Sequence, residues 1–122
     1  MVTVALDAMG GDNGVQATVF GAAQLSKENV DISVLLVGDV ARISEVLGDV
    51  DYDPRKIGIV SADGVVQMDE DPKVAVHEKP NCSVMRATRL VQEGRADAVV
   101  SAGHTGALIL AASHYLERIS GI

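Results

Sequence analysis

Short apolar runs alternate with longer amphipathic segments along the whole of this 122-residue chain. The apolar runs are residues 2–6, 32–37, 57–60 and 96–101. The segments with apolar residues at helical spacing are 14–25, 41–47, 82–93 and 104–119. No tight hairpin turn separates any two of the runs. This alternation predicts an α/β protein with a parallel sheet covered by helices on both faces.

The segment 62–80 interrupts that pattern. It contains Pro72 and Pro80 and shows no apolar periodicity. We therefore predict a long, partly irregular connection between the third strand and the next helix. Long connections of this kind in a compact domain are often functional or mobile.

Size and composition indicate one packed domain. The chain is long enough for one hydrophobic core and too short for two domains of ordinary size. Hydrophobic residues make up 48% of it, and the formal net charge is −7. Without a basic stripe, this balance excludes nucleic acid as a partner and disfavours an anionic membrane surface. An acidic chain that binds phosphate must use backbone N–H groups or a few well-placed cations.

Cys82 is the only cysteine, which rules out an intramolecular disulfide and fits a reducing compartment. It is either a nucleophile or a small buried residue near a helix start, and no visible partner base supports the first interpretation. The N-terminus shows no secretory signal, and no apolar run approaches the roughly 20 residues needed to span a bilayer. We therefore expect a cytoplasmic protein.

The first apolar run leads directly into a turn of two glycines between carboxylates. This turn contains Asp7, Gly10, Gly11 and Asp12. Glycine removes the Cβ atom where a ligand must come close, and the helix that follows begins with unpaired N–H groups. Such a turn can bind phosphate. The alternative is that Asp12 caps the helix and Asp7 braces the turn with hydrogen bonds.

A second glycine turn follows the fourth apolar run. It places Ser101, Gly103, His104, Thr105 and Gly106 at the carboxyl end of a predicted strand, where parallel sheets bind ligands. The Thr105 hydroxyl can donate to an anionic oxygen, and His104 can donate or act as an acid or base. Alternatively, Ser101 and Thr105 simply cap the last helix. If the two glycine turns converge, together they form one anion site.

Other ligand classes lack sequence support. The chain contains neither the G-x-G-x-x-G fingerprint of dinucleotide-binding proteins nor the P-loop pattern. No spacing of His, Cys, Asp and Glu matches a structural zinc site. His77 and His114 are expected to be surface residues or satisfied core residues.

Three segments together resemble a known family. They are Asp-Ala-Met-Gly-Gly-Asp at 7–12, Glu-Gly-Arg-Ala-Asp-Ala at 93–98 and Val-Ser-Ala-Gly-His-Thr-Gly-Ala at 100–107. In order and spacing they are similar to the bacterial phosphate acyltransferases of phospholipid synthesis, and the resemblance extends along the whole chain. Members of that family are much longer, so residues 1–122 are expected to be the N-terminal portion of a single acyltransferase domain.

The resemblance implies transfer of a fatty acyl group from acyl carrier protein to inorganic phosphate. It also implies a three-layer α/β/α fold with a mainly parallel sheet, as in isocitrate dehydrogenase and phosphotransacetylase. No metal or organic cofactor is implied. A homodimer is implied, together with peripheral membrane association through the part of the family sequence absent here. Phosphotransacetylase-like transfer from coenzyme A, or anion binding without catalysis, are the alternatives, and the isolated chain is expected to be inactive.

Our site hypothesis assigns the residues of the two turns to two roles, catalysis and phosphate binding. The residues expected to act in catalysis are His104, Thr105 and Asp7. Those expected to bind phosphate are Gly10, Gly11, Asp12, Ser101, Gly103 and Gly106. The chain departs from the family pattern at His104, where Asn is usual, and at Val15, where Pro is common. The stretch 78–84 also carries fewer lysines than the family tends to have.

Overall fold

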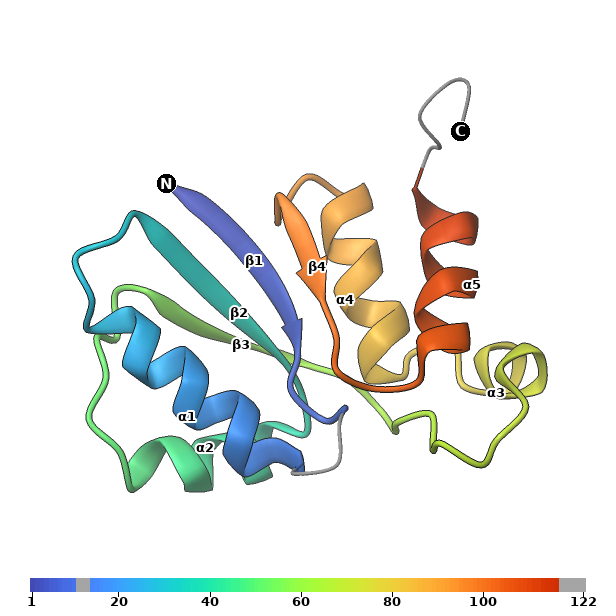
Figure 1. Ribbon diagram of the computed structural model, residues 1–122, viewed down its shortest axis with the longest axis horizontal. Helices are drawn as coiled ribbons and strands as arrows, with labels where there is room; N and C mark the ends of the chain where they lie inside the picture. Colours follow the sequence, from blue (N-terminus) through green and yellow to red (C-terminus); the bar gives the residue numbers. More distant parts are fainter. Residues whose placement is uncertain (11–13, 117–122) are drawn as a thin grey trace.

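The computed structural model describes residues 1–10 and 14–116 and contains a four-stranded, all-parallel sheet (Figure 1). The strands are β1 (Val2–Asp7), β2 (Ile32–Gly38), β3 (Ile57–Ser61) and β4 (Ala98–Val100). The helices are α1 (Gly14–Ser26), α2 (Val40–Gly48), α3 (Pro72–Glu78), α4 (Ser83–Gln92) and α5 (Thr105–Tyr115). All four predicted strands are present, although β4 is shorter than the apolar run that predicted it.

The helices form layers on the two faces of the sheet. Helices α1 and α2 pack on one face, and α4 packs on the other against β1, β2 and β4. Helix α5 lies beside α4, and α3 packs on α5. The expected three-layer α/β/α architecture is confirmed. It also explains why the strands read as nearly continuous apolar runs, since both faces of the sheet are covered.

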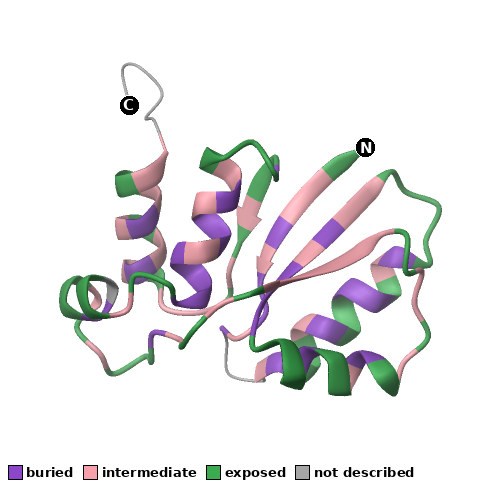
Figure 2. Cartoon of the chain, turned by 180° about the vertical axis from the view of Figure 1, so that it is seen from behind, coloured by how far each residue is buried: buried purple, intermediate pink, exposed green. Residues whose placement is uncertain are grey.

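The central strand β2 shows this double burial directly. Successive side chains on a strand point to opposite faces. Leu36 packs in the cluster with Val19 of α1 and Ile43 of α2, whereas Val37 packs in the cluster with Leu90 of α4. All five of these side chains are fully buried. Figure 2 shows buried positions in purple both on the strands and on the helices that cover them.

The order of the strands creates a reversal between β1 and β4. The sheet has the order β3-β2-β1-β4. The chain therefore steps outward from β1 to β2 to β3 and then returns to place β4 on the other side of β1. Right-handed crossovers put the helices of the two directions on opposite faces. Ligands in open parallel sheets bind at such switch points, outside the carboxyl ends of the strands.

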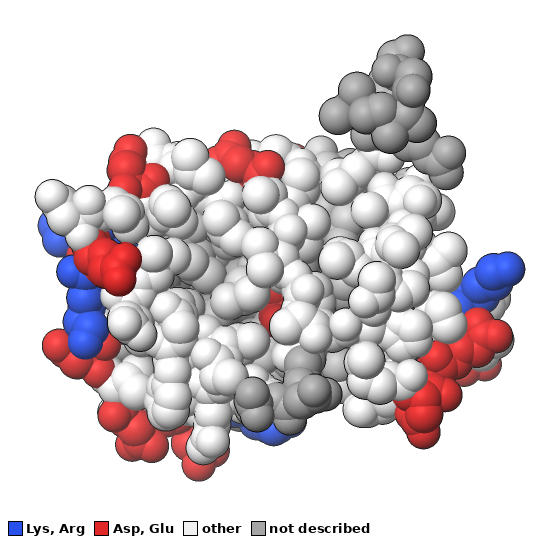
Figure 3. All heavy atoms as spheres, in the orientation of Figure 1, with Lys and Arg blue, Asp and Glu red and all other residues white. Residues whose placement is uncertain are grey.

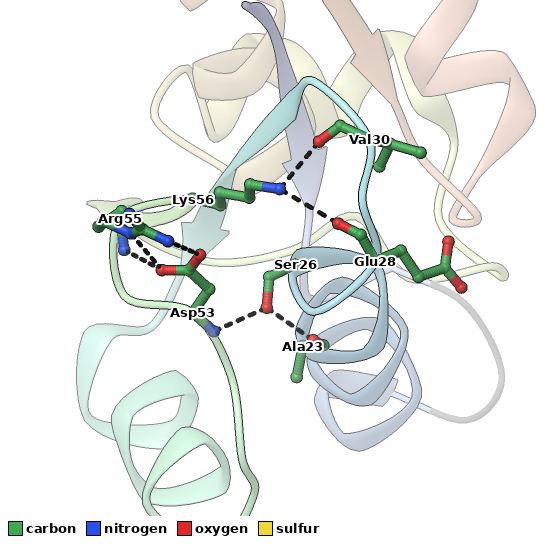
Figure 4. Close-up of polar contacts among 7 residues, drawn as sticks. All are labelled: Ala23, Ser26, Glu28, Val30, Asp53, Arg55 and Lys56. Carbon is green, nitrogen blue, oxygen red and sulfur yellow. Dashed lines mark hydrogen bonds and ion pairs between the residues drawn. The ribbon is translucent and has the colours of Figure 1, made fainter.

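The amino edge of the sheet is fixed by polar contacts (Figure 4). The Ser26 hydroxyl donates to the Ala23 carbonyl at 2.6 Å and accepts from the Asp53 amide at 2.9 Å. The Lys56 ammonium donates to the Val30 carbonyl at 2.9 Å. Arg55 pairs with Asp53 at 3.0 Å, and this pair lowers the pKa of the Asp53 carboxyl. These contacts join the end of α1 to the start of β3.

Helix α4 ends in a glycine cap. Gly94 has φ of +77°, which favours glycine. Its amide donates to the Val91 carbonyl at 3.1 Å, and the Arg95 amide donates to the Leu90 carbonyl at 2.9 Å. This pair of bonds is the Schellman motif.

The structure adds one short helix to the sequence prediction and corrects the end of another. The segment 62–80 is partly irregular, as expected, and α3 lies inside it. The Asp71 side chain accepts from the Lys73 amide at 2.9 Å, and Pro72 occupies the first helical turn. The last helix ends at Tyr115 rather than at 119, since Leu116 is extended with φ −112° and ψ 149°. Positions 117–119 of that prediction lie outside the described residues.

No helix within residues 1–10 and 14–116 combines the length and the apolar character needed to cross a membrane.

Candidate functional site

The two glycine turns meet at the switch point. A Cβ atom placed on Gly10 would lie 2.8 Å from the nitrogen of Gly103 and 2.9 Å from its Cα. A Cβ on Gly103 would lie 3.2 Å from the Cα of Gly10. The two backbones therefore touch, and any larger residue at position 10 would force them apart. The convergence of the turns expected from the sequence is present.

The Asp7 carboxylate accepts hydrogen bonds from both turns. Its Oδ1 accepts from the amides of Met9 at 3.1 Å and Gly10 at 3.2 Å, and its Oδ2 accepts from the Ser101 hydroxyl at 2.8 Å. Only 2% of Asp7 is exposed. The Ser101 Oγ also accepts from the Gly103 amide at 3.1 Å. Asp7 thus braces the turn, which was the alternative interpretation of this residue. The amides of Gly10 and Gly103 point at protein acceptors.

His104 caps α5. Its Nδ1 accepts from the Ala107 amide at 3.3 Å, and its Nε2 lies 3.1 Å from the Glu70 carbonyl oxygen. These contacts assign the hydrogen to Nε2, which donates to that carbonyl. Both ring nitrogens of His104 therefore form hydrogen bonds within the protein. The cap of α5 is His104 rather than Ser101 or Thr105, and its ring joins the helix to the residue that precedes Asp71.

Thr105 and Gly106 begin α5. Their amides have no acceptor among residues 1–10 and 14–116, and Thr105 is exposed. A Cβ on Gly106 would lie 3.0 Å from Pro72 Cγ and from His104 Cε1, so this glycine permits close packing against α3. Gly11 and Asp12, which the sequence also nominated, lie outside the described residues.

A cleft of about 170 Å³ opens beside the two turns. Its walls come from both sides of the switch point: the turns after β1 and β4, the start of α1, the first turn of α2 and the loop after β3. The lining residues are Met9, Gly10, Gly14, Val15, Arg42, Val65, Val66, Gln67, Met68 and Gly103. A cleft at the carboxyl edge of a switch point is the expected ligand position in a sheet of this kind.

Sequence reasoning missed Arg42. This residue lies in the first turn of α2, where the Asp39 side chain accepts from the amides of Ala41 at 3.0 Å and Arg42 at 3.3 Å. The signal was available, because Gly38 and Asp39 end β2 at the same edge as the glycine turns. A basic residue shortly after any of these strand ends is a candidate for the same cleft.

The loop after β3, which supplies the lining residues Val65 to Met68, is held by hydrogen bonds. The Lys79 ammonium donates to the Glu70 carboxylate at 2.7 Å and to the Val65 carbonyl at 3.1 Å. The Glu70 Oε1 also accepts from the Gln67 amide at 3.0 Å. The hydrogen bond from Lys79 holds the pKa of the Glu70 carboxyl below its usual range. No local sequence pattern indicates these contacts, since they depend on where α3 ends and places Lys79.

Cys82 is fully buried at the N-cap position of α4. Burial raises the pKa of its thiol. A protonated thiol is a weak nucleophile, which favours the interpretation of Cys82 as a small buried residue. His77 and His114 are exposed and line a separate hollow of about 440 Å³ between α3, α4 and α5. No three metal-ligating side chains gather among the residues that the structure describes.

Charge is sparse over one face of the molecule. In Figure 3 a broad uncharged area crosses the visible face, and most Lys, Arg, Asp and Glu atoms lie toward its margins. No basic stripe crosses the part of this face that the structure describes.

The sheet order and the cleft define a parallel α/β protein with a cleft at the switch point, the position where sheets of this kind bind ligands. Comparison with known proteins gives the family. The chain belongs to the family described as "Fatty acid synthesis protein", which it matches over residues 2–122. It is 45% identical over 119 residues to the phosphate acyltransferase of Dictyoglomus thermophilum, a match that covers 98% of this chain and 35% of the relative.

Two further relatives carry the same name. The phosphate acyltransferase of Desulfitobacterium hafniense is 50% identical over 121 residues, covering 98% of this chain and 35% of the relative. That of Synechocystis is 46% identical over 119 residues, covering 98% of this chain and 34% of the relative. The chain therefore spans about a third of the length of these relatives.

Proposed function

We propose that this chain forms the phosphate-binding part of an acyltransferase that moves a fatty acyl group from acyl carrier protein to inorganic phosphate. The names of the relatives support the acyltransferase class and phosphate as acceptor. The observation that carries the proposal is the contact between Gly10 and Gly103 at the switch point, beside a cleft of about 170 Å³.

The reaction asks for positioning more than for a strong base. Phosphate is already anionic, so an oxygen held in line with the thioester carbonyl can attack it directly. The new C–O bond forms a tetrahedral intermediate whose oxygen carries negative charge and needs hydrogen-bond donors. Collapse breaks the C–S bond, releasing the carrier thiolate and acyl phosphate. The thiolate then takes a proton from solvent.

Each site residue receives a role on this proposal. The hydroxyl and amide of Thr105, with the amide of Gly106, donate to phosphate or to the tetrahedral oxygen. Gly10 and Gly103 let the two turns touch, which brings the turn after β1 against the turn that precedes α5. Asp7 and Ser101 hold the two turns in contact, as their hydrogen bonds favour. His104 was expected to donate to the ligand, but its two occupied ring nitrogens favour a positioning role at the start of α5.

The partners of the whole protein belong to the same proposal. We infer that acyl carrier protein delivers the acyl group, that two copies of the whole protein associate, and that the protein works in the cytoplasm at a membrane surface. Because the chain spans only about a third of its relatives, we expect it to bind phosphate by itself without catalysing transfer.

Phosphate binding by the 122-residue chain tests the proposal directly. Titration with inorganic phosphate, followed by phosphorus NMR or calorimetry, is expected to show saturable binding that Gly103→Val abolishes. Gly48→Ala is the matched control, because a Cβ there meets nothing within 4 Å. Absence of binding by the unaltered chain, or undiminished binding by Gly103→Val, would contradict the proposed site.

The donor is tested in a protein that contains this chain and turns over. Formation of acyl phosphate from long-chain acyl carrier protein is expected to exceed formation from acetyl coenzyme A. The reverse preference would replace the carrier-protein proposal with phosphotransacetylase-like chemistry.

A further inference from the structure

The cleft beside the glycine turns contains one basic side chain. Among the described residues that line it, Arg42 is the only one with a charge. Arg42 forms no ion pair with a carboxylate of residues 1–10 or 14–116. Its backbone is held in the first turn of α2 by the Asp39 carboxylate, so the side chain starts from a fixed point on the wall of the cleft.

The negative charge around the cleft means that an anion can bind there only beside a cation. The chain carries a formal net charge of −7. The Asp7 carboxylate lies directly behind the wall, since its Oδ2 would be 2.9 Å from a Cβ on Gly10. An anion placed in the cleft therefore meets an unfavourable field unless a positive charge faces it at short range.

Lys79 does not fill this role. Lys79, the C-cap residue of α3, contacts the loop that lines the cleft, but its ammonium donates to the Glu70 carboxylate at 2.7 Å and the Val65 carbonyl at 3.1 Å. Two acceptors from the loop itself hold it within that loop. Arg42 is the basic residue that remains available to the cleft.

We propose that the Arg42 guanidinium binds the phosphate that enters this cleft and is the residue that selects a tetrahedral oxyanion there. The inference rests on the proposed function, because it names the residue that recognises the acyl acceptor. A guanidinium presents paired N–H donors that match two oxygens of a phosphate, and it keeps its charge at all physiological pH values. Phosphate bound in this way lies between Arg42 of α2 and the turn before α5, so it bridges the switch point.

Three variants test this in the 122-residue chain. Arg42→Gln removes the charge. Arg42→Lys keeps the charge but lacks the paired N–H donors of the guanidinium. Arg55→Gln is the control. Arg55 is an exposed guanidinium paired with Asp53 just before β3, at the amino edge of the sheet (Figure 4). The cleft lies at the carboxyl edge of the same sheet. The probe is inorganic phosphate, titrated by calorimetry at constant low ionic strength, with sulfate as competitor.

We expect Arg42→Gln to weaken phosphate binding by about tenfold or more, as the loss of a hydrogen bond to a charged group predicts. Arg42→Lys should lose less. Arg55→Gln should stay within about twofold, because Arg55 lies at the opposite edge of the sheet from the cleft and is paired with Asp53. Urea unfolding in phosphate-free buffer should be the same for Arg42→Gln and the unaltered chain. Sulfate should compete in the unaltered chain and compete less well for Arg42→Gln.

The outcomes separate the inference from the proposed function. If the unaltered chain binds phosphate and Arg42→Gln binds it equally well, the role of Arg42 is overturned and the proposed function stands. An equal loss in Arg55→Gln would mean that overall charge is responsible, which also overturns the role of Arg42. If the unaltered chain does not bind phosphate at all, the proposed function fails and this inference fails with it.

Discussion

Asp7 organises the site at the level of single residues. It is a buried carboxyl that accepts from the amides of Met9 and Gly10 and from the Ser101 hydroxyl. Asp7→Ala leaves these three donors without their acceptor, so we expect a loss of about 3 kcal/mol in the free energy of unfolding. Urea denaturation measures this. The control is Asp31→Ala, whose carboxylate is 77% exposed in a pair with the N-terminus and should cost no more than about 1 kcal/mol.

Gly10 and Gly21 give opposite predictions for the same substitution. Gly10→Ala would place a Cβ 2.8 Å from the backbone nitrogen of Gly103, so one of the turns must shift. We expect a loss of about 1–3 kcal/mol, the usual cost of overpacking. Gly21 lies in α1, and a Cβ there meets nothing within 4 Å. Gly21→Ala should stabilise the chain by about 0.5–1 kcal/mol through better helix propensity. Equal unfolding free energies for the two variants would contradict the contact between the turns.

The sequence was sufficient to predict that the two glycine turns meet. It was insufficient to predict which groups accept hydrogen bonds from the amides of Gly10 and Gly103. Strand ends of a parallel sheet share one edge, so convergence followed from the pattern of elements. The bond from Ser101 to Asp7 joins residues 94 positions apart. It depends on the register that pairs Leu6 with Val100, and no local pattern encodes that register. Arg42 was missed for the same reason, because its access to the cleft depends on the placement of α2.

At the scale of elements, α3 shows that apolar periodicity does not identify a very short helix. The longer helices bury a repeated apolar stripe, and their positions were predicted correctly. Helix α3 has seven residues, so its stripe is too short to be distinguished from an irregular segment. Its start did carry a signal, since Asp71 and Pro72 form a helix cap followed by proline in the first turn. For helices of this length, the capping residues indicate the position of the helix better than apolar periodicity does.

The loop before α3 should respond to acid. The Lys79 ammonium lowers the pKa of the Glu70 carboxyl. Since the pKa in the folded chain is depressed, the stabilisation from this pair is present above the unfolded value of about 4.3 and is lost as the pH falls through the folded value. Carbon NMR of the Glu70 carboxyl should show that Lys79→Met raises its pKa, while Lys27→Met, at an exposed position, leaves it unchanged. An unchanged Glu70 pKa in Lys79→Met would contradict the ion pair.

At the scale of the whole molecule, the reversal between β1 and β4 divides the chain into two parts that both line the cleft. The part from β1 to β3 supplies Gly10 and Arg42, and the part from β4 onward supplies Gly103. Covalent connection between the parts runs through the loop 62–71, α3 and α4. A ligand that binds both parts therefore stabilises their relative position as well as its own site.

Phosphate should consequently protect the whole fold and not only the cleft. A ligand at one hundred times its dissociation constant adds about 2.7 kcal/mol to the free energy of unfolding when it binds only the folded state. We expect inorganic phosphate to raise the thermal midpoint and to slow amide exchange on both sides of the switch point, at Val15 and at Thr105. Chloride at the same ionic strength is the control, since it supplies screening without a tetrahedral ligand. Slower exchange on one side alone would mean that phosphate binds to a single turn, and the shared site between β1 and β4 would be wrong.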